Sequence, residues 1–263
     1  GSNATITGTS LSLSARNHRI DVGNVFSFND FDDWDDISDT LESAVTGKIL
    51  GDSNYYVEAI GGAASQGVAV QGSFGVMVFS DTLTASLGEL STVDVGTGAV
   101  VLEADGDFFA KGVSGAVAAS TSSAAVGVSG TVIVSSGTTL AELGAGAEIT
   151  AAGSVSIDAR AVQDIWVLAA SASAASTAGV AGVATVITSK NRTEALIGSG
   201  AQVTVSNAGA VALRAQNDFT TFSLAAGMGA GGKAGIGAGA SVVTVNNVTR
   251  AVMEDGASAG NGV

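Results

Sequence analysis

The chain has 263 residues and a hydrophobic content of 46 %, of which little is aromatic, and its formal net charge is −14. Such an acidic chain lacks the basic stripes that nucleic acids and anionic membrane surfaces require, so neither is expected as a partner. The sequence has no cysteine, which excludes disulfides and thiolate metal sites. It also has no proline, as expected where almost every strand N–H is hydrogen-bonded.

The N-terminal residues 1–4, Gly-Ser-Asn-Ala, have the sequence of an expression scar, and no signal peptide is evident. We predict a single β-solenoid fragment over residues 5–263. The last residues, 261–263, lie just inside what the pattern predicts to be another coil. The sequence therefore predicts a piece of a longer repeat array.

From residue 8 onward the chain repeats itself. A motif of alternating apolar residues begins at Gly98, Gly153 and Gly209, which are 55 and 56 residues apart, and an earlier copy begins at Gly8. A second motif, Thr-x-Ala followed by x-Leu or x-Ile, lies at 139–144 and 193–198, with variant copies at 83–88 and 249–253. Self-similarity at a fixed period predicts a stacked array. We expect four repeats, at 8–97, 98–152, 153–208 and 209–263.

Each repeat is predicted to contain three strand segments, because apolar and polar residues alternate with a period of two. In the third repeat these are 154–159 leading into 165–171, then 179–188, then 193–205. Three segments predict coils of about 18 to 19 residues, a size that suits a β-solenoid. The many Ala, Val and Gly residues predict backbone layers packed very close together. The alternation places Leu13, Leu102, Ile157 and Leu213 in one inward column, and Ser14, Glu103, Asp158 and Arg214 in an outward one.

The first repeat carries an insertion, residues 21–56, of different chemistry. Apolar residues spaced by three or four predict one amphipathic helix, and they are Phe28, Phe31, Trp34, Ile37 and Leu41. The carboxylates between them do not have the spacing of a calcium loop, so no metal site is predicted and a solvated helix face is favoured. Because aromatic residues cluster here, a partner-binding role is the remaining interpretation; its candidate residues are Phe28, Phe31, Trp34, Tyr55 and Tyr56.

No catalytic residues and no cofactor are predicted. His18 is the single histidine and follows a strand, where a plain surface position is expected. The sequons Asn191–Thr193 and Asn247–Thr249 recur with the repeat, which favours a stacked Asn/Thr corner bonded to the backbone over glycosylation. The uncharged residues 165–189 are long enough to cross a bilayer, but Ala, Ser, Gly and Thr dominate them, so no membrane insertion is expected.

The strings 147–159 and 201–215 resemble the coils of filamentous-haemagglutinin-like secreted bacterial adhesins. The longer unit, Ile165–Ala174, Gly179–Ile187 and Thr193–Gly198, resembles the Ala/Gly/Ser-rich repeats of very large filamentous adhesins of the leukotoxin-annotated type. The resemblance covers about residues 5–20 and 57–263 and leaves out the insertion. It implies a right-handed parallel β-helix, export to the cell surface and a stalk or adhesion role, and it brings no catalytic residues.

The expected function is therefore a non-catalytic stalk or adhesion segment of a large secreted or surface-anchored bacterial adhesin. Its partner would be a glycan or protein on a host or neighbouring cell. The alternative is a β-helix that binds or processes carbohydrate, for which Trp166 and Phe219 are the candidate outward aromatic residues. A third possibility is a rod that polymerises through its coil ends.

Overall fold

The computed structural model describes residues 2–17, 55–206 and 208–261, and these residues form strands and turns without a helix. Every strand pairing in the described residues is parallel. The prediction of an all-β fold with parallel strands is thus confirmed. The predicted acidic helix and His18 fall at positions 18–54, outside the described residues; of the insertion, Tyr55 and Tyr56 alone are described, and they begin a strand.

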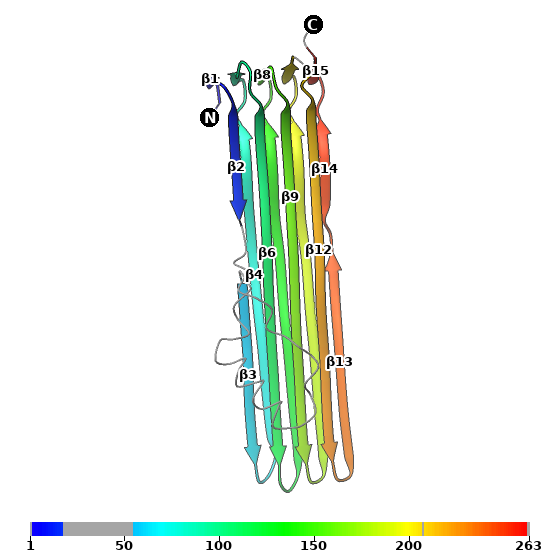
Figure 1. Ribbon diagram of the computed structural model, residues 1–263. Helices are drawn as coiled ribbons and strands as arrows, with labels where there is room; N and C mark the ends of the chain where they lie inside the picture. Colours follow the sequence, from blue (N-terminus) through cyan, green and yellow to red (C-terminus); the bar gives the residue numbers. More distant parts are fainter. Residues whose placement is uncertain (1, 18–54, 207, 262–263) are drawn as a thin grey trace.

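Two sheets of long strands face each other, and a sheet of short strands lies at one end (Figure 1). The β6 sheet contains β2 (Leu11–Asn17), β3 (Tyr55–Ser65), β6 (Val100–Ser120), β9 (Val155–Ala175) and β12 (Val211–Gly231). The β7 sheet contains β4 (Ala69–Leu87), β7 (Ala124–Leu143), β10 (Ala178–Ile197), β13 (Ala234–Val245) and β14 (Val248–Met253). The end sheet contains β1 (Thr5–Thr7), β5 (Thr92–Asp94), β8 (Glu148–Ala151), β11 (Gln202–Val205) and β15 (Ser258–Asn261).

The second and third repeats each contribute one strand to each of the three sheets, whereas the first contributes β2 and β3 to the β6 sheet and the fourth contributes β13 and β14 to the β7 sheet. After a long strand of the β6 sheet the chain turns sharply, returns along the β7 sheet and passes through the end sheet (Figure 1). Val155 lies opposite Val100 on one side and Val211 on the other, so neighbouring strands are offset by one repeat. The second motif is also in register, since Thr193 lies opposite both Thr139 and Thr249. The predicted repeat is therefore the unit of strand pairing.

The prediction of three coils per repeat is wrong, because one repeat forms one coil. The strand β9 continues for 21 residues and agrees with the expected segment 154–171, but β10 continues for 20 residues through the corner that was expected between 188 and 193. Ser189 and Asn191, assigned to a corner, lie inside β10. Period-two alternation shows that a segment is extended, but it carries no mark of where two extended segments merge into one strand.

The space between the two long sheets changes in character along the strands. Next to the end sheet it is filled by aliphatic side chains, including Leu102, Leu143, Ile149 and Ile157, all fully buried. An aromatic group with Phe108, Phe79 and Tyr55 follows. Towards the turns small side chains predominate, as at Ala69, Ala118 and Ala125. The predicted inward column is confirmed, since Leu13, Leu102, Ile157 and Leu213 lie opposite one another and Leu102 and Ile157 are fully buried.

In the part nearest the turns the two sheets approach each other backbone to backbone. A Cβ atom added to Gly179 of β10 would lie 2.1 Å from the carbonyl oxygen of Ala230 in β12, and one added to Gly127 of β7 would lie 2.9 Å from that of Ala172 in β9. Ordinary sheets pack about 10 Å apart because side chains separate them. Glycine is required here because any larger side chain would push the sheets apart, which confirms the close packing predicted from composition.

Candidate functional site

Of the five predicted partner-binding residues, the structure describes Tyr55 and Tyr56. Phe28, Phe31 and Trp34 lie outside the described residues. Tyr55 and Tyr56 are neighbours on β3 and so point to opposite faces of the sheet. The ring of Tyr55 stacks on Phe79 with ring centroids 5.1 Å apart, and Phe108 contacts both rings. Tyr55 therefore packs against the aromatic core, and a partner-binding role for it stays a prediction.

Tyr56 belongs instead to a row of side chains on the outer face of the β6 sheet. Four neighbouring strands place Tyr56, Lys111, Trp166 and Phe222 opposite one another, and we call these four residues the aromatic row. Trp166 is 41 % exposed and Phe222 is 42 % exposed. Phe109 lies beside the row, with its ring centroid 6.0 Å from that of Trp166, and the centroids of Trp166 and Phe222 are 5.9 Å apart.

Of the two outward aromatic residues predicted from the sequence, one is right and one is wrong. Trp166 lies on the outer face, as predicted. Phe219 packs against the aromatic core, because it lies opposite Gln163, an inward residue of β9. The sequence analysis missed Phe222, although it follows Trp166 by one repeat of 56 residues and could have been found from that spacing.

Charged and polar groups lie within the aromatic row and beside it. The ammonium group of Lys111 lies 4.6 Å from the centroid of the Phe109 ring, a cation–π contact. The hydroxyl of Tyr56 donates a hydrogen bond of 2.9 Å to Oε2 of Glu58. Burial, this hydrogen bond and the Glu58 charge all raise the pKa of Tyr56 well above its ordinary value, so it stays a neutral donor. The row thus offers flat apolar rings with hydrogen-bonding groups at their edge.

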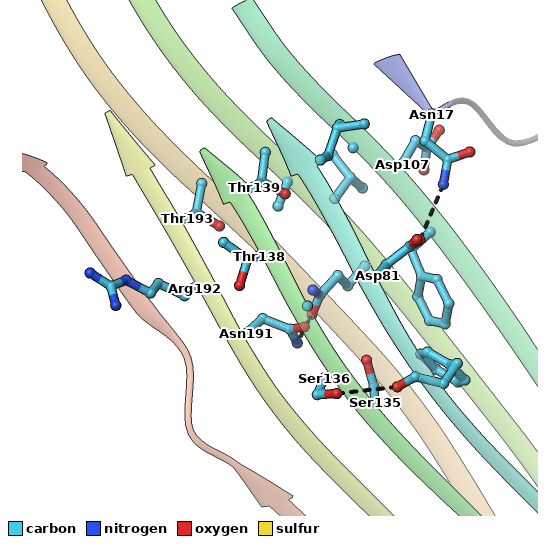
Figure 2. A pocket seen from close by; sticks show the side chains of 18 residues that line it. Asn17, Asp81, Asp107, Ser135, Ser136, Thr138, Thr139, Asn191, Arg192 and Thr193 are labelled. Carbon is cyan, nitrogen blue, oxygen red and sulfur yellow. Dashed lines mark hydrogen bonds between the residues drawn. The ribbon is translucent and has the colours of Figure 1, made fainter. Parts of the chain in front are cut away.

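A second candidate is a polar layer inside the fold, between the aliphatic and aromatic parts of the core (Figure 2). Its centre is Asn191, which is 4 % exposed. The Asn191 side-chain amide donates to Oε1 of Gln163 at 2.7 Å and to Oγ of Ser189 at 2.6 Å. At one side of the layer Asn17 donates to the Asp81 carboxylate at 3.2 Å. These contacts join the β6 and β7 sheets through side chains.

The polar layer has room for water but not for a substrate. Its cavity has a volume of about 40 Å³, enough for a few water molecules. Several buried atoms lack a protein partner, namely Oδ1 of Asn191, Oγ1 of Thr193 and both side-chain polar atoms of Asn217. Buried polar groups are normally hydrogen-bonded, so internal water is the expected partner. We interpret the layer as structural.

The two sequons form part of this layer. Oδ1 of Asn247 accepts a hydrogen bond of 3.2 Å from the backbone N–H of Asn191, which confirms the predicted bond between a stacked asparagine and the backbone. Their location differs from the prediction, since Asn191 lies within a strand and Asn247 between β13 and β14. The burial of Asn191 leaves its amide no space for a glycan.

Ionic side chains occupy the outer face of the β7 sheet near the end sheet. The buried carboxylate of Glu194 pairs with both Arg192 and Arg250. Burial raises the pKa of Glu142 above its usual value, and the charges of Glu254 and Glu89 add to the shift. Because the pKa of Glu142 is higher in the folded chain than in the unfolded chain, the folded chain takes up this proton at a higher pH. The free energy of unfolding therefore increases as the pH falls through the pKa of the folded chain towards that of the unfolded chain.

Two further properties of the described residues concern metal binding and membrane crossing. Within residues 2–17, 55–206 and 208–261, no three His, Asp or Glu side chains are placed to hold a metal ion. The same ranges contain no helix that could cross a membrane. The carboxylates of the insertion, at positions 30–39, lie outside these ranges.

No protein-family model, no curated protein and no solved structure matches this chain. Of the two candidate sites, the aromatic row is the one open to a ligand.

Proposed function

We propose that the chain is a segment of right-handed parallel β-helix, a β-solenoid, that serves as a non-catalytic stalk or adhesion segment of a large secreted or surface-anchored bacterial adhesin. The observation that supports this most is the unbroken register of one repeat in all three sheets. Each further repeat can add one strand to every sheet without disturbing the last. Such an arrangement suits an extended array and provides no converging catalytic groups.

The geometry favours the adhesive part of this role over simple extension. Strands of a sheet are about 4.8 Å apart, so one repeat of 55 residues lengthens the stack by only that distance. A strand of 21 residues is about 70 Å long, so the same repeat adds a broad outer face. A protein built this way gains surface faster than length, and its outer faces are where a receptor would bind.

A carbohydrate-binding role is the second candidate, and the aromatic row is the observation that favours it. Exposed indole and phenyl rings can stack on the apolar face of a sugar ring, while neighbouring polar groups bond its hydroxyls. Trp166 and Phe222 offer such rings, and Tyr56 and Lys111 lie opposite them in the same row. The ligand class would be a surface glycan, which is also a common receptor for adhesion.

The test is binding of the whole chain to an array of glycans and extracellular-matrix proteins. Trp166→Ala removes the largest ring of the row, and Ile60→Ala removes an outward side chain of similar exposure, 40 %, from the same sheet. We expect binding by the original chain and by Ile60→Ala. If the aromatic row is the site, Trp166→Ala should weaken glycan binding at least about tenfold, the loss expected for a central aromatic contact.

The outcomes separate the two candidates. Binding that survives Trp166→Ala supports adhesion through another surface and contradicts the glycan site. Absence of binding to every array ligand contradicts the adhesive role. Release of new reducing ends from any bound glycan contradicts the non-catalytic assignment.

A further inference from the structure

The outer face of the β7 sheet carries an apolar surface that the proposed function does not use. Near the turns, five successive outward positions of β4, β7, β10 and β13 form rows in register. We call these twenty residues the valine face. They are Val70, Gly72, Phe74, Val76, Val78, Val126, Val128, Gly130, Val132, Val134, Val180, Gly182, Ala184, Val186, Thr188, Ile236, Ala238, Ala240, Val242 and Thr244.

The valine face carries no charge, and its residues are exposed or half-buried except for Gly130. Phe74 is 63 % exposed, Val76 is 62 % exposed and Ile236 is 58 % exposed. Ten of its residues are valine, and the polar ones are two threonines. The nearest charged outward residue on the same sheet is Lys190, one row beyond Thr188 in β10. On a chain with a net charge of −14, a neutral apolar area of this kind requires an explanation.

We infer that the valine face is a self-association surface, on which a second copy of this chain packs face to face to form a two-fold dimer. Five rows along strands and four strands across cover about 30 by 19 Å, on the order of 600 Å². Pairing two such faces buries about 1,200 Å² in total, which reaches the lower bound for specific, stable protein interfaces. The area of the face is therefore compatible with a specific dimer.

The shape of the face suits a copy of itself. The long strands run nearly straight and side by side (Figure 1). The ring of Phe74 lies across Gly130 of the neighbouring strand, where an added Cβ would be 2.9 Å from the ring, so it fills that gap instead of standing upright. Two flat sheets covered by valine pack well face to face, as the inner faces of β-sandwiches do. Because the same patch meets itself, the contact closes as a dimer.

Charge and hydrogen bonding favour a second copy over a lipid bilayer. Two chains of like charge repel each other, and the valine face is where they can meet without bringing charges together. In the described residues β4 forms one edge of this sheet and β13 the other. In hydrocarbon the unpaired N–H and C=O groups of an edge strand are costly, whereas water satisfies them beside a protein interface.

The test is sedimentation equilibrium of the whole chain over the micromolar range, without ligand. Val128 lies on β7 inside the face and is 37 % exposed; Val117 lies on β6, on the outer face of the opposite sheet, and is 53 % exposed. Val128→Lys places a charge in the proposed interface, and Val117→Lys is the control with the same change of charge. We expect a dimer from the original chain and from Val117→Lys, and association at least about tenfold weaker for Val128→Lys.

Cross-linking provides a second measurement that does not depend on a destabilising change. The chain has no cysteine, so Val132→Cys introduces a single thiol into the face. A short bis-maleimide should link two Val132→Cys chains, and the same reagent should not link Val117→Cys chains. Four results would overturn the inference: a monomer at every concentration, equal association of the two lysine variants, growth beyond the dimer, or binding to lipid vesicles that Val128→Lys abolishes. Since no receptor is present, these results are independent of the proposed adhesive function.

Discussion

At the scale of single residues, the closeness of the two long sheets depends on where glycine faces inward. Two glycines of β10 illustrate the difference. Gly179 faces the opposite sheet, where an added Cβ would lie 2.1 Å from the carbonyl oxygen of Ala230. Gly182 faces outward, and an added Cβ would meet no atom within 4 Å. The same residue type thus has a packing role at one position and none at the other.

Alanine substitution at these two positions should have opposite effects on stability. Gly179→Ala forces a methyl group into backbone of the facing strand, so we expect a loss of about 1–3 kcal/mol, as for overpacked cores. Gly182→Ala meets open space and restricts the unfolded chain, so we expect no loss or a gain of about 0.5 kcal/mol. Urea unfolding followed by circular dichroism measures both. Equal effects would mean that the sheets do not approach each other as described.

At the scale of elements, each long strand crosses three kinds of interior. A strand such as β6 passes Leu102 in the aliphatic part, Phe108 in the aromatic part and Ala118 where the sheets nearly touch. The aromatic part acts as a wedge, because Tyr55, Phe79 and Phe108 come from three strands and both sheets. Side-chain size therefore sets the separation of the sheets along the strands.

Removing the centre of this wedge should destabilise the fold strongly. Phe108 is 7 % exposed and its ring lies 4.2 Å from Phe79 and 5.1 Å from Tyr55. We expect Phe108→Ala to cost about 3–5 kcal/mol through lost burial and a cavity. Phe222→Ala, at a site 42 % exposed on the outer face, is the control and should cost less than about 1 kcal/mol. Thermal unfolding of both variants measures the difference, and similar losses would contradict this description of the core.

The sequence predicted pairing within these elements better than it predicted their ends. The repeat placed Val100, Val155 and Val211 in register, and the alternation correctly assigned the Leu102 column to the interior. It could not show that one strand spans residues 178–197, because alternation looks the same on both sides of a missing corner. Phe219 was assigned to the wrong face for a related reason. It lies on the same strand as Val211 and an even number of residues after it, so the two side chains point to the same, inner face. The aromatic row could have been predicted by comparing Trp166 with Phe222, the residue one repeat later.

At the scale of the whole molecule, the register of one repeat determines how the protein would grow. Every described coil pairs with the next through all three sheets, from β1 and β5 to β11 and β15. Interior coils have neighbours on both sides, so in such stacks stability increases with the number of repeats. The number of residues in one coil then determines how far each added repeat extends the stack across its strands.

Inserting a second copy of residues 153–208 directly after residue 208 tests this architecture. We expect the added copy to pair in register, to raise the unfolding temperature, and to extend the stack by about 4.8 Å while the long dimension stays near 70 Å. Coils one third as large would instead extend it by about 14 Å. Small-angle scattering distinguishes these values, and the same 56 residues in shuffled order serve as the control. The shuffled segment should be removed by protease while the true copy resists, because only the true copy presents the inward Val, Ile and Ala columns that pair and pack with both neighbours.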